Sequence, residues 1–150
     1  MNFLEWGKNM SSNQVTIAKM VSLDDSNPIA LPVDFLETLK PKEGSSSNAV
    51  MILAPSTKII RIIPSKSNTV LKVAIEIGEL SPDFLQELGV VFMRSKIKTL
   101  YSTGLCFTQE TCVYEGYIDA ADVEMPTEKL QSELQGIKGV SQVVITTLGE

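Results

Sequence analysis

The residues that could carry chemistry in this chain are few, because its 150 residues include no histidine. Without an imidazole there is no Ser-His or Cys-His nucleophile pair, and the commonest transition-metal ligand is missing. Cys106 and Cys112 are interpreted as packed thiols of a reducing compartment, with a redox pair as the alternative. Glu115 and Asp119 could form a catalytic carboxylate pair, but we expect them on the solvated face of a strand. The sequence therefore predicts a protein that is not an enzyme and uses no cofactor or metal.

A different kind of site, for a small ligand, is expected at the turn Gly78–Ser81. A glycine at position 78 would tolerate positive φ and close approach by a ligand. The backbone amides at a helix start can hold an anion, whereas the carboxylate of Glu79 would suit an ammonium group. A well-capped helix start without a ligand is the alternative interpretation.

The elements that would position these residues follow from the hydrophobic periods of residues 69–148, which run strand, helix, strand, strand, helix, strand. Leu71, Val73, Ile75 and Ile77 alternate with more polar residues, as on one buried face of a strand. Right-handed crossovers then predict a four-stranded antiparallel sheet with both helices on one face, the ferredoxin-like arrangement of the α+β class. The expected elements are the strand Thr69–Ile77, a helix from Pro82 to Ser95 with Ser81 as N-cap, the strands Ile97–Phe107 and Thr111–Ala120, the helix Pro126–Lys138 and the strand Val140–Leu148.

Gly78 and Leu80 fall at a strand-to-helix turn of this order, and residues 69–148 thereby resemble the ACT regulatory domain. Members of that family commonly pair through their sheets and bind amino acids or other small effectors beside a Gly-x-Leu turn. The resemblance implies a ligand site between two copies, with small polar residues of the second strand as lining; Gly104 could equally mark a bulge. The ligand-binding residues implied are Gly78, Glu79, Leu80, Ser81, Ser102, Thr103 and Gly104.

The first part of the chain is predicted to be a small, mostly β module over residues 14–64, after an N-terminal segment 1–13 and before a linker 65–68 and a domain 69–150. Pro32, Leu36, Leu39 and Gly44 resemble landmarks of the AbrB-type swapped-hairpin domain, whose members fold as intertwined dimers. About fifty residues in short strands also bury too little surface to fold securely alone, so we expect a homodimer or higher homo-oligomer. The expected elements are the strands Gln14–Leu23, Ile29–Leu31, Asn48–Ala54 and Lys58–Ile63, and the helix Val33–Lys40.

Charge differs between the two parts. Residues 1–68 hold seven basic and six acidic residues, net +1, whereas residues 69–150 hold six and twelve, net −6. Many AbrB-type members bind DNA through basic strands and loops, so the resemblance makes duplex DNA an expected partner. The alternative is that these cations keep a small dimer in solution, because +1 is far from a basic domain. The DNA-binding residues expected are Lys19, Lys40, Lys42, Lys58 and Arg61.

The chain has no apolar run long enough for a membrane span and no signal-peptide pattern near residue 1, which predicts a cytoplasmic protein without a membrane partner. The function expected from these observations is a dimeric transcription regulator that senses an amino acid or similar metabolite through its ACT-like domain. The alternative is a regulatory or assembly subunit that binds another protein and not DNA.

Overall fold

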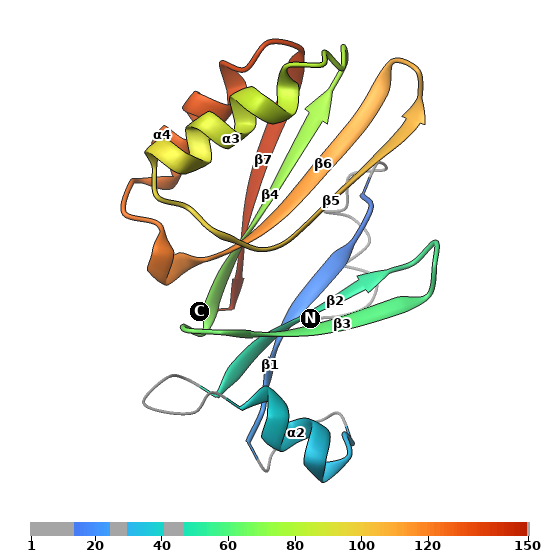
Figure 1. The fold of residues 1–150 in the computed structure, drawn as a ribbon, viewed down its shortest axis with the longest axis vertical. Helices are drawn as coiled ribbons and strands as arrows, with labels where there is room; N and C mark the ends of the chain where they lie inside the picture. The colour runs from blue at the N-terminus through green and yellow to red at the C-terminus, as the bar shows by residue number, and fades with distance from the viewer. Residues whose placement is uncertain (1–13, 25–29, 41–46, 150) are drawn as a thin grey trace.

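The computed structural model describes residues 14–24, 30–40 and 47–149 of the chain (Figure 1). The segment 1–13, Lys42 and Gly44 lie outside these ranges. The described residues form an α+β fold with two antiparallel sheets. No helix in these ranges is long and apolar enough to cross a membrane. The elements are β1 Ile17–Ser22, α2 Val33–Leu39, β2 Asn48–Ala54, β3 Ile59–Ser65, β4 Thr69–Ile77, α3 Phe84–Arg94, β5 Thr99–Thr108, β6 Thr111–Asp119, the 3-10 turn η2 Ala120–Asp122, α4 Thr127–Gln135 and β7 Val140–Gly149.

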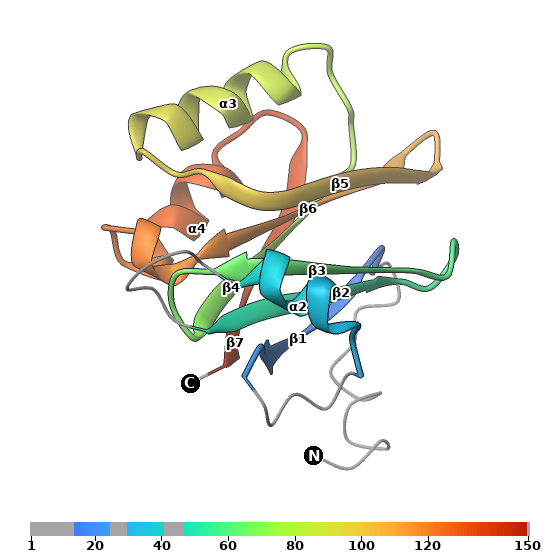
Figure 2. The same ribbon diagram turned by 60° about the horizontal axis from the view of Figure 1, so that its bottom comes forward.

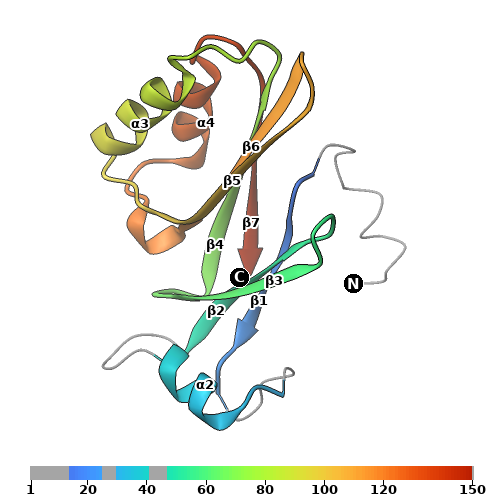
Figure 3. The same cartoon turned by 45° about the vertical axis from the view of Figure 1, so that its right-hand side comes forward.

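The four-stranded sheet has the order β5-β6-β4-β7, and every neighbouring pair is antiparallel. Both α3 and α4 lie on one face of this sheet (Figures 1 and 3). The alternation in β4 points one set of side chains at the helices, as the sequence predicted. The core on this face includes Val73, Ile75, Ile77, Phe84, Leu88, Val91, Leu130, Leu134 and Ile137.

Both helices are shorter than the sequence predicted. Asp83, and not Ser81, is the N-cap of α3, and no side chain caps the first turn. The spacing of Phe84, Leu85, Leu88, Val91 and Phe92 in the sequence predicts one buried helical face, but Leu85 is 69% exposed. The helix α4 ends at Gln135 because Gly136 already forms its C-cap, donating its amide to the Ser132 carbonyl.

The three-stranded sheet has the order β1-β2-β3, and α2 packs on its outer face (Figure 2). Leu36 and Leu39 of α2 contact the cluster formed by Val21, Leu23 and Ala49, as expected for the inward side of this helix. Ala30 and Leu31, expected to end a short strand that starts at residue 29, are not in a strand.

The inner face of the three-stranded sheet packs against the second face of the four-stranded sheet (Figure 3). Residues of β2, β4 and β6 share one buried cluster, made of Val50, Ile52, Val70 and Tyr117. Only residues 66–68 connect β3 to β4. The four-stranded sheet is therefore covered on both faces, by helices on one and by a second sheet on the other.

Candidate functional site

The predicted ligand turn is closed against the loop that precedes β7. The amides of Gly78 and Glu79 both donate to the carbonyl oxygen of Gly139, at 3.0 and 3.4 Å. Gly139 has φ +88°, and a Cβ there would collide with the Glu79 carbonyl oxygen. A Cβ at Gly78 would lie 3.9 Å from the Cβ of Ser141, an ordinary contact, and Gly78 does not have positive φ. Gly139, and not Gly78, is therefore the glycine whose positive φ this turn requires.

The electrostatics of this region oppose the binding of an anion. The first two amides of the turn are occupied, and the acidic residues Glu79 and Asp83 are exposed, as is Leu80. The hydroxyl oxygen of Ser81 is buried and has no hydrogen-bond partner among the described residues. A groove between α3 and α4 is lined by Asp83 and Glu87, and also by Glu133, which forms an ion pair with Arg94 at 3.3 Å. A positively charged group fits this surface better than a carboxylate.

The predicted residues on β5 lie away from this turn. Gly104 pairs with Tyr114 of β6, which pairs in turn with Ile75 of β4. Because neighbouring strands are about 4.8 Å apart, β5 runs about 10 Å from β4. One protomer therefore does not bring Ser102–Gly104 together with Gly78–Ser81 around a small ligand. The ladder is regular at Gly104, so the bulge alternative is not borne out; the register shifts lie between Thr99 and Tyr101 and beyond Cys106.

Tyr114 connects the β5 segment to the interior. Burial raises the pKa of its hydroxyl, and a hydrogen bond with Ser102 works in the opposite direction. Ser102 is thus already partnered within the sheet, whereas Thr103 and Gly104 follow it along an edge strand.

The predicted DNA-binding residues are dispersed over the N-terminal sheet. The guanidinium of Arg61 lies over the ring of Tyr101, 4.8 Å from its centre, on the face turned toward the second sheet. Lys19 lies on the opposite face, since it pairs with Met51 and through it with Ile62. Lys58 lies in the exposed turn between β2 and β3. Lys40 forms an ion pair with Glu37 at 3.3 Å, and Lys42 lies outside the described residues.

A polar cluster that the sequence did not predict lies between the two sheets. Glu115 is 0% exposed and forms an ion pair with Lys72, which is 6% exposed, at 3.2 Å. The carboxylate also accepts hydrogen bonds from the amide and hydroxyl of Thr16, and Lys72 donates to the Thr16 carbonyl. The hydroxyl of Tyr117 lies 2.7 Å from that of Thr16. The prediction that Glu115 lies on a solvated face was wrong, because the N-terminal sheet covers that face.

The prediction of a solvated Asp119 was also wrong. Asp119 is 0% exposed, and its carboxylate accepts hydrogen bonds from the hydroxyl of Ser67 at 2.7 Å and from the amides of Lys66, Ser67 and Ala121. Burial alone would raise the pKa of Asp119, but these hydrogen bonds outweigh burial and lower it. Asp119 therefore fixes the short connection between the two sheets.

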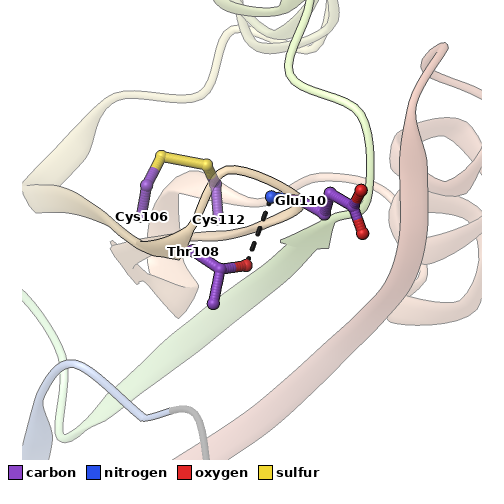
Figure 4. Close-up of a disulfide and its surroundings, with 4 residues drawn as sticks. All are labelled: Cys106, Thr108, Glu110 and Cys112. Carbon is purple, nitrogen blue, oxygen red and sulfur yellow. Dashed lines mark hydrogen bonds between the residues drawn. A yellow bond between two sulfur atoms is a disulfide. The ribbon is translucent and has the colours of Figure 1, made fainter.

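The two cysteines form a disulfide, which corrects the interpretation as free thiols (Figure 4). They occupy opposite positions on β5 and β6, with Cα atoms 3.9 Å apart. The sequence predicts this position, because the two cysteines have the same parity on neighbouring strands joined by a short turn. Among the described residues, no three His, Cys, Asp or Glu side chains lie close enough to hold a metal ion.

One signal in the sequence could have revealed the buried second face. On β6, Val113 and Tyr117 share a face with Glu115 and Asp119, whereas Cys112 and Ile118 lie on the other face. Large apolar residues on both faces of a strand indicate that both faces are covered. Comparison with known proteins adds no family: no family model matches this chain, and no curated protein matches it.

Proposed function

We propose that this chain is a dimeric regulatory protein whose residues 69–150 form an ACT-like module for a small metabolite such as an amino acid. The strand order β5-β6-β4-β7 with α3 and α4 on one face supports a ferredoxin-like arrangement of this module. The ligand segments Gly78–Ser81 and Ser102–Gly104 lie too far apart within one protomer, so the proposed site is completed by a second copy. The acidic surroundings of Glu79 and Asp83 favour an effector that presents an ammonium group there.

The observation that carries the proposal is the core shared by the two sheets. Val50 and Ile52 of the N-terminal sheet pack directly on Val70 and Tyr117 of the C-terminal sheet. The buried pair of Lys72 and Glu115 adds a polar connection to the chain just before β1. A change in β4 or β6 on ligand binding would therefore alter contacts of the N-terminal module, which is the physical requirement for coupling two sites.

For the N-terminal module, binding to a protein has better support than binding to DNA. The basic residues expected to bind phosphate lie on different faces, and Arg61 is engaged by Tyr101. The exposed surface of α2 and of the β2–β3 hairpin instead carries the apolar side chains of Val33, Phe35 and Ile60. Exposed apolar side chains of this kind suit a second copy of an AbrB-like module or another protein. Transcription regulation through DNA is the second candidate, favoured by the charge difference between the parts of the chain.

A thermal-shift screen of the full chain with amino acids and other small amines tests the ligand proposal. A ligand at a hundred times its dissociation constant stabilises the folded protein by about 2.7 kcal/mol. We expect at least one amine-bearing compound to raise the melting temperature and Gly78→Val to weaken that shift, because a valine side chain would occupy the turn without straining its backbone. Lys129→Glu on the exposed side of α4 serves as the control. A shift that Gly78→Val leaves unchanged would place the ligand elsewhere, and no shift with any amino acid would reject the amino-acid sensor.

Fluorescence anisotropy with mixed-sequence duplex DNA at low salt decides between the two candidate functions, binding to a protein and binding to DNA. Phosphate contacts supply nearly all non-specific affinity and are strongest at low salt. Binding that falls steeply with salt and is weakened by Lys40→Glu together with Lys58→Glu, but not by Lys129→Glu, would support the transcription regulator. We expect no binding at low salt, together with dimers in sedimentation equilibrium, as the protein-contact proposal requires; a stable folded monomer would reject the dimer.

A further inference from the structure

The disulfide between Cys106 and Cys112 lies beside the turn of the β5–β6 hairpin (Figure 4). Beyond it, the ladder holds only the pair of Thr108 with Thr111, and the turn is supported by a hydrogen bond from the Glu110 amide to the Thr108 hydroxyl at 3.2 Å. The register of the ladder shifts between Cys106 and Thr108. The disulfide is thus the strongest cross-strand link next to the turn of the hairpin.

The two cysteine residues differ in exposure. Cys112 is 5% exposed and belongs to the core beneath α3 and α4, next to Ile77 across the β4–β6 ladder. Cys106 is exposed on β5, which is the edge strand of its sheet within the described residues. A reagent can therefore approach Cys106 from the open edge, whereas Cys112 is covered by packed side chains.

We propose that this disulfide is a redox-active site that reacts with dithiols and with small thiol-disulfide couples through the sulfur of Cys106. This inference does not depend on the proposed ligand or output. A thiolate of the reductant attacks Sγ of Cys106, forms a mixed disulfide there and breaks the protein S–S bond, so that Cys112 leaves as a thiolate and takes a proton from solvent. The second thiol of the reductant then attacks its own sulfur in the mixed disulfide and releases Cys106. Two electrons and two protons pass to the protein, and the dithiol leaves as a disulfide.

Access decides which sulfur is attacked. The burial of Cys112 disfavours its thiolate as a leaving group, which slows the reaction, but attack on the buried sulfur would require the core to open. In a reducing compartment, as the sequence predicts, an accessible disulfide of this kind interconverts with its two thiols and is not a permanent structural cross-link. Reduction frees the hairpin end from Phe107 to Glu110, which carries an exposed phenylalanine at the sheet edge.

The test uses the oxidised full chain in native buffer with reduced glutathione as the probe. Mixed disulfides are trapped with N-ethylmaleimide and located by peptide mass spectrometry, and dithiothreitol completes the reduction. We expect glutathione on Cys106, complete reduction without denaturant, and restoration of the disulfide by oxidised glutathione. Glutathione found on Cys112, or a disulfide that resists reduction until the protein is unfolded, would overturn the proposal.

Matched single variants give a second measurement. In Cys112→Ser the remaining thiol of Cys106 should form a mixed disulfide with oxidised glutathione at least about tenfold faster than the remaining thiol of Cys106→Ser, because only the first is accessible. Circular dichroism checks that both variants fold. If one of them does not fold, the location of glutathione in the wild type by mass spectrometry remains the test. Hydrogen exchange of residues 107–110 should be faster in the reduced wild type. Equal rates in the two variants, or unchanged exchange on reduction, would contradict the proposed access or the proposed opening.

Discussion

Glu115 and Asp119 lie on the same face of β6, four residues apart, and both are fully buried, yet they are stabilised by different means. Glu115 faces a full positive charge on Lys72, from a neighbouring strand, and donors of Thr16, from the start of the chain. Among the described residues, no cation forms an ion pair with the Asp119 carboxylate: Lys66 contributes its backbone amide there, and its ammonium group pairs with Asp122 at 2.7 Å. Glu115 forms an ion pair with a lysine that is distant in sequence. Asp119 instead accepts hydrogen bonds from backbone amides and a hydroxyl group of neighbouring turns.

The difference shows how each carboxylate supports the fold. The cluster around Glu115 joins three segments that are remote in sequence, so it forms only when the two sheets are packed together. The donors around Asp119 come from residues 66–67 and from the start of η2, so most of this site can form with the connection itself. A buried ion pair costs desolvation of two charges, and removal of one partner leaves the other charge uncompensated.

The largest effect is expected for Lys72→Met. The substitution leaves the carboxylate of Glu115 buried without its cation, which should lower the free energy of unfolding by about 3–5 kcal/mol. Urea denaturation followed by circular dichroism measures the change.

The control for this prediction is the double variant Lys72→Met with Glu115→Gln. Glutamine keeps an acceptor for the Thr16 donors without the charge, so part of the lost stability should return. If Lys72→Met lowers the free energy of unfolding by less than about 1 kcal/mol, the pair of Lys72 and Glu115 behaves like a solvated surface ion pair. Glu115 and Asp119 would then not differ in the way proposed.

A smaller effect is expected for Asp119→Asn, about 1–3 kcal/mol, because one acceptor oxygen and the charge are lost while the amide donors stay buried. The hydrogen bonds lower the pKa of Asp119 in the folded protein below its ordinary value of 3.8. Its stabilisation is therefore fully present above the unfolded pKa and is lost as the pH falls through the folded pKa. Urea denaturation from neutral to acidic pH should show the wild type and the variant converging in acid.

The matched comparison for the acid dependence is Asp122→Asn. Asp122 lies on the same turn, and its one ion pair within the described part of the chain is with the exposed Lys66 ammonium. This surface pair should contribute little, so the variant should follow the wild type at every pH. A gap between wild type and Asp119→Asn that persists below the folded pKa would show that charge is not the source of the effect.

The smallest effect is expected for Tyr117→Phe, about 0.5–1.5 kcal/mol. The substitution removes the hydroxyl beside Thr16, but the Thr16 hydroxyl keeps its hydrogen bond to Glu115. Thermal unfolding measures the change. A loss as large as that of Lys72→Met would indicate that the phenol, and not the ion pair, joins the two sheets.

The sequence alone predicted most of the elements of this protein and the core-facing side of several of them. The alternation of Leu71 to Ile77 predicted the bounds of β4 and its helix-facing side. The helical spacing of Leu130, Leu134 and Ile137 predicted that these side chains share one side, and all three are buried, Ile137 just beyond the end of α4. The parity of Cys106 and Cys112 placed them opposite each other. These features depend on residues close in sequence, whose geometry is fixed by the repeat of a strand, a helix or a short turn.

Tertiary structure decided what covers each face and which polar groups meet. Lys72, Glu115 and Thr16 come together only because the N-terminal sheet packs on the second face of the C-terminal sheet, and no local pattern records a pairing across 99 residues. The same packing placed the guanidinium of the half-buried Arg61 over the ring of Tyr101. The local apolar period predicts which side chains share a face of an element. Whether a charged side chain on that face is buried depends on partner residues that are distant in sequence.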